Sequence, residues 1–223
     1  MLHSRREFVG KALTSVAVAG VSGLIPTTAI RAQTALSPEA ALQQLIDGNR
    51  RFVEGRLTSF SEDLDMLKAK TAEKQEPFAA VLSCADSRVP VELIFDQSIG
   101  HVFVTRVAGN IATSAVIASL EYGVAVLGTR ALMVLGHGNC GAVKASIEAK
   151  AVPGQISALY PYVRPAVDQA GSDLDGAIKA NARIQAALLR QSSPVLAEQI
   201  KQNQLKVVAA YYDLASGNVS LLD

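Results

Sequence analysis

Two cysteines and one histidine are the residues whose types and spacing point most directly to chemistry. Cys84 closely follows the apolar run 78–82, and His137 and Cys140 follow a second apolar run, 131–135. Each run has the length and composition of a short buried strand. Because open α/β sheets place their chemistry at the carboxyl ends of strands, this is where the three side chains are expected. Two thiolates and one imidazole form a ligand set of catalytic zinc sites with an open fourth position.

A carboxylate and a guanidinium follow the first cysteine. Asp86 lies two residues after Cys84, and Arg88 lies two residues further on. An arginine that holds a carboxylate in bidentate fashion keeps it ionised and fixes its direction. The alternative is a plain structural salt bridge at a strand end. For the two cysteines the alternative is a disulfide, which would explain neither His137 nor the neighbouring acid and base.

The two motifs Cys84-Ala-Asp-Ser-Arg88 and His137-x-x-Cys140 resemble the zinc-site pair of the β-class carbonic anhydrases. The resemblance covers about residues 37–221, and further segments resemble blocks of that family in the family's order. These segments are Phe95–Gly100, Val104–Asn110, Ser119–Gly123 and Gly136–Ala142. The resemblance implies an α/β fold with a central, mostly parallel β-sheet, flanking helices, an N-terminal helical arm and a C-terminal edge hairpin.

The same resemblance implies reversible hydration of CO₂ to bicarbonate and a proton, by attack of zinc-bound hydroxide. One Zn²⁺ per chain is expected, bound by Cys84, His137 and Cys140, with Asp86 and Arg88 orienting the zinc water. In some members of the family the equivalent aspartate becomes a fourth ligand. Asp86 is therefore predicted both as a catalytic residue and as a metal ligand.

Weaker assignments concern residues around this site. Gln97 resembles a position near the active-site mouth that hydrogen-bonds bicarbonate; the alternative is a polar residue that ends a helix. The backbone N–H groups around Gly138 and Gly141 are expected to orient a bound anion. Arg106 matches an arginine of a non-catalytic bicarbonate site, but that site also uses a tryptophan, which this chain lacks. His101 is expected to be a surface residue rather than a proton relay.

The first 32 residues have the pattern of an export signal. The segment Ser4–Lys11, with its adjacent arginines, resembles the twin-arginine signal. The apolar run 12–25 is too short to span a bilayer comfortably, and small residues near Ala32 offer a cleavage zone. The expectation is a cleaved signal, 1–32, and a periplasmic domain, 33–223, with no stable membrane anchor. A retained anchor or an ordinary amphipathic N-terminus is the alternative.

Length and charge limit the remaining possibilities. A chain of 223 residues, with 49% hydrophobic residues and no tryptophan, suits a single compact domain. Without residues 1–32 the chain has 17 basic and 19 acidic side chains, a net charge of −2. It has no basic stripe and no block of like charges, so nucleic-acid binding is not expected.

Helix signals mark both ends of the domain. Ser37 and Pro38 are predicted to begin a helix, and its segment 49–52 resembles the family's arm, which lies across a partner subunit. A homodimer or a dimer of dimers is therefore expected, and a helix packed on its own domain is the alternative. Region 153–194 is predicted to be helical, with Asp173 as a start signal and a buried stripe. The stripe is expected to contain Ile178, Ile184, Leu188 and Leu189.

Three other functions remain open from the sequence. One is a hydrolase of carbon disulfide or carbonyl sulfide that uses the same zinc chemistry on a similar scaffold. Another is a non-catalytic zinc-binding protein, against which the pair Asp86–Arg88 argues, because structural zinc sites need no such pair. The last is a thiol redox protein, although the chain has no Cys-x-x-Cys motif.

Overall fold

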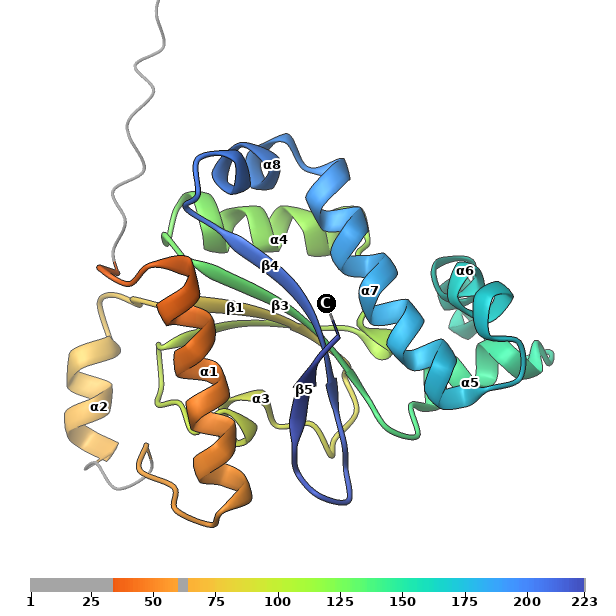
Figure 1. Cartoon of the computed structure of the whole chain (residues 1–223), viewed down its shortest axis with the longest axis horizontal. Coiled ribbons are helices and arrows are strands. Elements are labelled where there is room, and N and C mark those ends of the chain that lie inside the picture. Colours follow the sequence, from red (N-terminus) through yellow and green to blue (C-terminus); the bar gives the residue numbers. More distant parts are fainter. Residues whose placement is uncertain (1–33, 60–63, 223) are drawn as a thin grey trace, which may run out of the picture.

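A computed structural model describes residues 34–59 and 64–222 of the chain. These residues form one β-sheet with helices on both faces (Figure 1). No helix within them combines the length and apolar character needed to cross a membrane. The predicted export signal, 1–32, lies outside the described residues.

The sheet has five strands in the order β2-β1-β3-β4-β5. The pairs β1–β2, β1–β3 and β3–β4 are parallel, and β5 runs antiparallel to β4. This confirms the predicted mostly parallel sheet with an antiparallel edge hairpin. The strands are β1 (Ala79–Ser83), β2 (Val102–Arg106), β3 (Ala131–His137), β4 (Lys206–Tyr212) and β5 (Val219–Leu221).

The helices connect and cover these strands. Five of them precede β3 or span the first crossovers: α1 (Pro38–Val53), α2 (Leu64–Thr71), α3 (Val91–Ile94), the 3₁₀ helix η1 (Ala108–Asn110) and α4 (Ser114–Ala125). The other five lie between β3 and β4: α5 (Gly141–Glu148), the 3₁₀ helix η2 (Ile156–Leu159), α6 (Tyr160–Ala170), α7 (Leu174–Ser192) and α8 (Pro194–Lys201).

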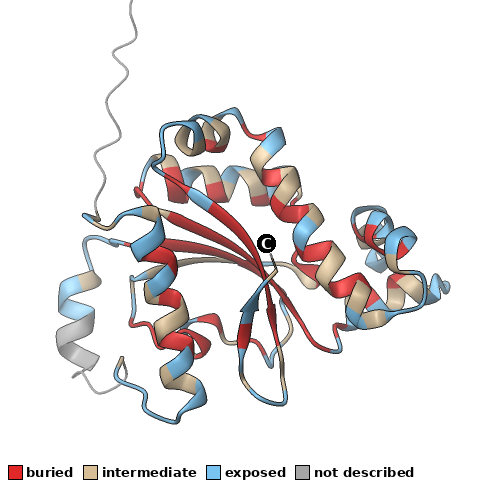
Figure 2. Ribbon diagram, viewed as in Figure 1, coloured by how far each residue is buried: buried red, intermediate tan, exposed pale blue. Residues whose placement is uncertain are grey.

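The sheet has a hydrophobic core on each face. Side chains alternate along a strand, so Ala79 and Val81 of β1 pack with α1 and α3, whereas Ala80 and Leu82 pack with α4, α7 and α8. Strands β1 and β3 are buried along their whole lengths (Figure 2). Burial on both faces explains why these strands are continuous apolar runs in the sequence.

Helix α1 begins as predicted and lies on the sheet of its own chain. The side chain of Ser37 accepts a hydrogen bond from the backbone N–H of Ala40, and Pro38 is the first helical residue. Near the other end, the buried Asn49 donates to the carbonyl of Gly217 and accepts from the N–H of Val219. Helix α1 is thus tied to the C-terminal hairpin of its own chain, and the arm across a partner subunit remains a prediction.

Helix α7 begins after Asp173 as predicted, but its buried stripe differs from the prediction. Ile178 and Leu189 are buried, whereas Ile184 and Leu188 are only half-buried. The rest of the buried face consists of three alanines, Ala177, Ala182 and Ala186, and the two amides Asn181 and Gln185. The prediction failed here because hydrophobicity alone does not show that a buried amide has found polar partners.

Candidate metal centre

The three predicted ligands meet because their strands are neighbours. In the parallel pair of β1 and β3, Ser83 aligns with Leu135, so Cys84 and His137 lie at adjacent carboxyl ends. After β1 the chain turns to β2 on one side of it and then crosses to β3 on the other. Such a change of direction opens a crevice at the carboxyl ends of the strands, where α/β proteins bind their ligands.

The geometry of the three side chains fits a zinc ion. One donor atom from each of Cys84, His137 and Cys140 lies within 4.8 Å of the others, and all three residues are buried. The two sulfurs are 4.0 Å apart and belong to free cysteines rather than a disulfide. Tetrahedral zinc with Zn–S bonds of about 2.3 Å places two sulfurs roughly 3.8 Å apart.

The histidine ring is also prepared for a metal. Nδ1 of His137 lies 3.0 Å from the carbonyl oxygen of Gly138, so Nδ1 carries the proton and donates it. Nε2 is buried and has no hydrogen-bond partner among the described residues. A lone pair on Nε2 therefore points into the cluster, as metal-binding histidines require.

The two thiols differ in acidity. A hydrogen bond from the Cys140 thiol lowers the pKa of Cys84 below its usual value, against the opposing effect of burial, and the N–H of Gly109 adds to the lowering. The same hydrogen bond and burial raise the pKa of Cys140. Zinc binds cysteine as thiolate, so metal binding has to remove the proton that the two thiols share.

Asp86 and Arg88 form the predicted bidentate pair. Nε of Arg88 donates to Oδ1 of Asp86 over 2.9 Å, and a terminal guanidinium nitrogen donates to Oδ2 over 2.7 Å. The backbone N–H of Arg88 also donates to Oδ1. Arg88 reaches the carbonyl of Asn139 as well, at 3.2 Å, so it joins the two loops that carry the zinc ligands.

The carboxylate of Asp86 stands at the edge of the ligand cluster. Its Oδ2 is 3.9 Å from Nε2 of His137. The hydrogen bonds from Arg88 hold the pKa of Asp86 well below its usual value, so this carboxylate is ionised at neutral pH. Both oxygens are engaged by Arg88. Ligation of zinc by Asp86, which remains a prediction, requires it to leave this pair.

Two neighbouring residues support the loop of Cys84. The guanidinium of Arg106 donates to the carbonyl oxygens of Cys84 and Asp86. The backbone N–H of Gly109 donates to the Cys84 sulfur over 3.3 Å. Arg106 matches an arginine of a bicarbonate site whose tryptophan this chain lacks, and in this structure it holds the backbone of the ligand loop. The contact from Gly109 had no signal in the sequence, because a backbone donor leaves no trace in residue type.

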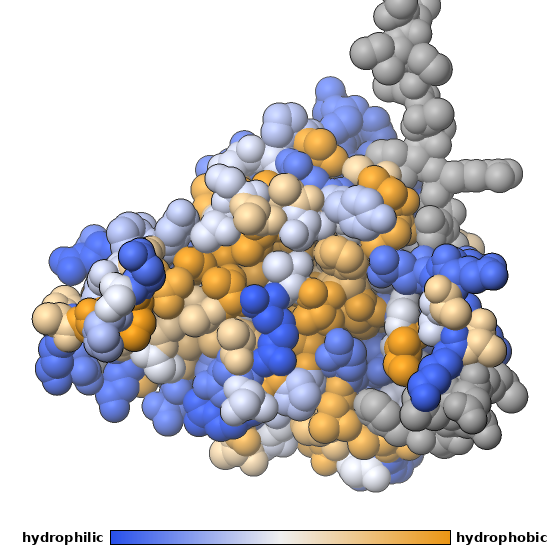
Figure 3. Space-filling view, turned by 180° about the vertical axis from the view of Figure 1, so that it is seen from behind, coloured by the Kyte–Doolittle hydropathy of each residue, from blue (hydrophilic) through white to orange (hydrophobic). Residues whose placement is uncertain are grey.

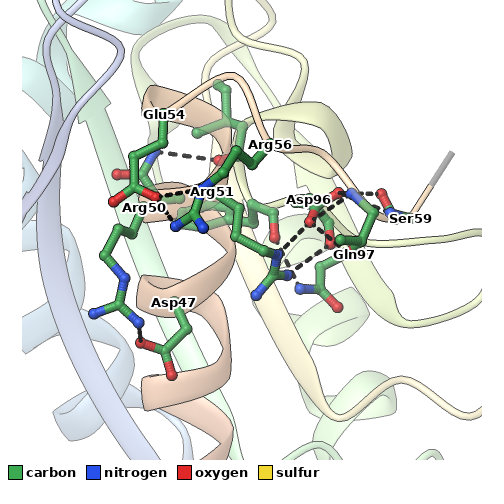
Figure 4. A network of polar contacts seen from close by, with 12 residues as sticks. Asp47, Arg50, Arg51, Glu54, Arg56, Ser59, Asp96 and Gln97 are labelled. Atoms are coloured by element: carbon green, nitrogen blue, oxygen red, sulfur yellow. Dashed lines mark hydrogen bonds and ion pairs between the residues drawn. The ribbon is translucent and has the colours of Figure 1, made fainter. Parts of the chain in front are cut away.

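Gln97 lies in a different polar network. Its side-chain amide donates to the carbonyl of Phe95 over 2.8 Å, beside the buried carboxylate of Asp96. Asp96 accepts hydrogen bonds from Arg51, Thr58 and Ser59 (Figure 4). This network joins α1 to the end of α3 and lines a hollow of about 510 Å³. The structure places the Gln97 side chain in this network. Its contact with substrate remains a prediction.

Gly138 and His101 are also placed by the structure. The N–H of Gly138 donates to the carbonyl of Tyr212 over 3.0 Å. This bond occupies the donor that was expected to face an anion, so the substrate contact of Gly138 remains a prediction. An added Cβ at Gly138 would lie 3.0 Å from the hydroxyl of Tyr211, which explains the absence of a side chain there. His101 is exposed, as expected of a surface residue.

Comparison with known proteins identifies the class to which this fold and site belong. The family model for carbonic anhydrase matches residues 79–219, which include every predicted zinc ligand. The curated "Carbonic anhydrase 2" of Mycobacterium tuberculosis is 37% identical, over 84% of this chain and 94% of the relative. The carbonic anhydrase of Pseudomonas aeruginosa is 33% identical, over 82% of this chain and 88% of the relative.

Solved structures agree with the sequence relatives. A β-carbonic anhydrase from Coccomyxa, in complex with acetazolamide, has a TM-score of 0.65 and 27% identity over 81% of this chain and 86% of that one. The β-carbonic anhydrase CcaA has a TM-score of 0.64 and 27% identity over 82% of this chain and 95% of that one. The chain belongs to the carbonic anhydrase family, with the fold of its β class. This family depends on zinc, and the Cys84–His137–Cys140 cluster fits that ion.

Proposed function

We propose that this chain catalyses the reversible hydration of CO₂ to bicarbonate and a proton, with zinc held by Cys84, His137 and Cys140. The observation that carries the proposal is the coincidence of the ligand cluster with a bidentate Asp86–Arg88 pair at its edge. A structural zinc site needs no ionised carboxylate at its border. Zinc at these ligands supplies a water whose pKa is lowered from about 16 to about 7.

The roles of the two other side chains follow from their geometry. Asp86 is ionised, and its Oδ2 lies 3.9 Å from Nε2 of His137. In this position it accepts a hydrogen bond from the reacting water and fixes the orientation of that water. Arg88 prevents rotation of this carboxylate. Fixing the orientation of a reactant lowers the entropic part of the barrier. A small, uncharged substrate needs no charged cradle beyond this.

Stopped-flow CO₂ hydration from about pH 6 to pH 9, on protein assayed for zinc, tests this function. We expect rapid turnover that rises with pH and close to one zinc per chain. Absence of turnover at every pH, in protein with full zinc, would contradict the proposal. Carbon disulfide and carbonyl sulfide are then the substrates to assay.

We further propose that residues 1–32 direct export of the folded, zinc-loaded chain to the periplasm. The support is the sequence: adjacent Arg5 and Arg6, then an apolar run and small residues before Ala32. Export of a folded chain lets the thiols bind metal in a reducing compartment first. Fractionation of cells that make the wild type and an Arg5→Lys, Arg6→Lys variant is the test. We expect the variant to stay cytoplasmic; equal periplasmic amounts would refute the export route.

We also propose that the chain self-associates as a homodimer or a dimer of dimers. Tyr122 of α4 and Val126, which caps the end of that helix, are 48% and 53% exposed, and Tyr122 packs on Phe103 of the edge strand β2. Figure 3 shows hydrophobic side chains gathered across the middle of one face of the molecule. Hydrophobic surface of this kind marks protein interfaces.

Sedimentation velocity measures this association. We expect the wild type to sediment as a dimer or larger, and Val126→Lys to shift toward a smaller species. Ile156→Lys, a change at an exposed aliphatic residue of η2, serves as the matched control and is expected to leave the species unchanged. A monomeric wild type would contradict the proposal.

A further inference from the structure

Two buried amides on α7 stand close to the zinc site without taking part in it. Asn181 and Gln185 are 1% and 2% exposed, one helical turn apart on a face otherwise made of alanine and aliphatic side chains. A buried amide costs free energy unless its donors and acceptor are satisfied. Their partners therefore show what these residues do.

Asn181 and Gln185 form hydrogen bonds with the segment after β2 at two points. Nδ2 of Asn181 donates to the carbonyl oxygen of Gly109 over 2.8 Å. Oε1 of Gln185 accepts from the backbone N–H of Ala112 over 2.9 Å. Nε2 of Gln185 donates to Oδ1 of Asn181, at 3.2 Å, and to the carbonyl of Tyr162, at 3.0 Å. The mutual bond fixes which end of Asn181 faces Gly109.

Gly109 links these hydrogen bonds to the metal ligand Cys84. Its carbonyl is held by Asn181, and its N–H donates to the Cys84 sulfur over 3.3 Å. Gly109 has a φ of 76°, in the left-handed region that is open chiefly to glycine. This backbone turn directs the carbonyl toward α7 and the N–H toward the sulfur. An unrestrained glycine has many other conformations, so the N–H needs an external hold.

We infer that Asn181 and Gln185 are positioning residues for the zinc centre, which act by fixing the N–H of Gly109 on the sulfur of Cys84. The inference rests on the zinc site described above. A hydrogen bond to a ligand sulfur fixes its direction and withdraws electron density from it, and such outer partners tune how tightly a metal is held. The amides thus link the scaffold helix α7 to the strength and geometry of metal binding.

The first test uses the wild-type protein loaded with ¹¹³Cd²⁺, a tetrahedral substitute for zinc that is visible by NMR. A hydrogen bond N–H···S–Cd transmits a scalar coupling between the amide proton and the metal. We expect a ¹H–¹¹³Cd correlation at the amide of Gly109, with its proton shifted downfield. If a folded, cadmium-loaded protein shows no such correlation, the inference is overturned.

The second test uses variants of Asn181. Asn181→Asp keeps the acceptor for Gln185 and removes the donor to Gly109, and Asn181→Leu removes both at similar volume. Each is expected to lose zinc to a chelator about 10-fold faster, within the 10–100-fold range typical of outer-shell partners. The thiolate-to-metal absorption of the Co²⁺-loaded protein should shift as well, because that band reports on the sulfur's environment.

Leu189→Val is the matched control, on the same buried face two turns further along α7. It removes core volume without touching the amides, so we expect slightly lower stability with unchanged zinc release and cobalt spectrum. Folded Asn181 variants that match the wild type in both readouts would refute the inference. Neither readout measures CO₂ turnover, so the result stands apart from the proposed activity.

Discussion

At the scale of single residues, the site depends on matched pairs of side chains rather than on isolated groups. His137 has its proton on Nδ1 because the carbonyl of Gly138 accepts it there. Asp86 is ionised because Arg88 holds both of its oxygens. The direction of these two functional side chains is therefore set by a neighbour within two residues in the chain.

Arg88→Ala is predicted to retain most of the zinc and lose most of the rate. The ligands Cys84, His137 and Cys140 remain, but the carboxylate of Asp86 loses the bonds that fix its direction. We expect a fall in CO₂ hydration of roughly 10- to 100-fold, the range for outer-shell partners of a metal site. Zinc content and stopped-flow rates of the same preparation measure the two effects.

Arg88→Lys separates geometry from charge, because lysine keeps the charge but has no bidentate fork. We expect its rate to lie between those of the wild type and the alanine variant. An Arg88→Ala enzyme with the full wild-type rate would show that the pair has no role in orienting the reacting water.

At the scale of elements, helices α1 and α3 meet through a buried carboxylate and a glycine. Asp96, at the end of α3, accepts hydrogen bonds from Arg51 of α1 and from Thr58 and Ser59 of the segment that follows (Figure 4). Burial opposes its ionisation, but these bonds outweigh burial and lower the pKa of Asp96. The network therefore holds the chain beyond α1 against the domain.

Asp96→Asn is predicted to destabilise the protein by about 3 kcal/mol at pH 7. The amide is uncharged, so Arg51 loses the partner of its ion pair. A carboxylate with a lowered folded-state pKa stabilises the native state above its unfolded pKa, about 4. This stabilisation is lost as the pH falls through the lowered value. Urea unfolding of both proteins at pH 7 and pH 3 should show a smaller difference in the free energy of unfolding between wild type and variant at pH 3. An equal difference at both pH values would rule out an ionised Asp96 in the native state.

Gly48→Ala is predicted to separate α1 from α3. A Cβ at this position would lie 1.8 Å from the carbonyl oxygen of Phe95, a backbone atom that has no freedom to move aside. We expect a loss of about 3 kcal/mol in the free energy of unfolding, at the upper end of overpacking effects. Gly141→Ala, where the space is open, is the control and should stay within about 1 kcal/mol of the wild type. Equal stabilities would show that α1 docks differently.

At the scale of the whole molecule, zinc joins parts of the chain that are distant in sequence. Cys84 follows β1, and His137 and Cys140 flank the loop after β3, on strands between which the sheet changes direction. The ion therefore crosslinks two loops that only the completed fold brings together. An ion that binds the native state and not the unfolded chain stabilises the fold.

Removal of zinc by a chelator is predicted to lower the melting temperature by about 5–10 °C. This corresponds to about 2.7 kcal/mol for a ligand at 100 times its dissociation constant in a domain of this size. Scanning calorimetry with and without added zinc measures the effect. Cys140→Ser should lose both metal and turnover, and its melting temperature should not respond to zinc. An equal response in this variant would place the stabilising zinc elsewhere.

The sequence by itself determined the ligand set, the Asp86–Arg88 pair, the strands and the class of fold. Metal binding depends on residue type, and buried strands are apolar runs, so both can be recognised in the amino-acid sequence. The tertiary structure alone decided that Gln97 faces the Asp96 network and that Gly109, Asn181 and Gln185 support Cys84. The contacts of Gly109 with Cys84 and Asn181 join groups far apart in the chain, and the sequence carries no pattern for them because any residue offers a backbone N–H and carbonyl.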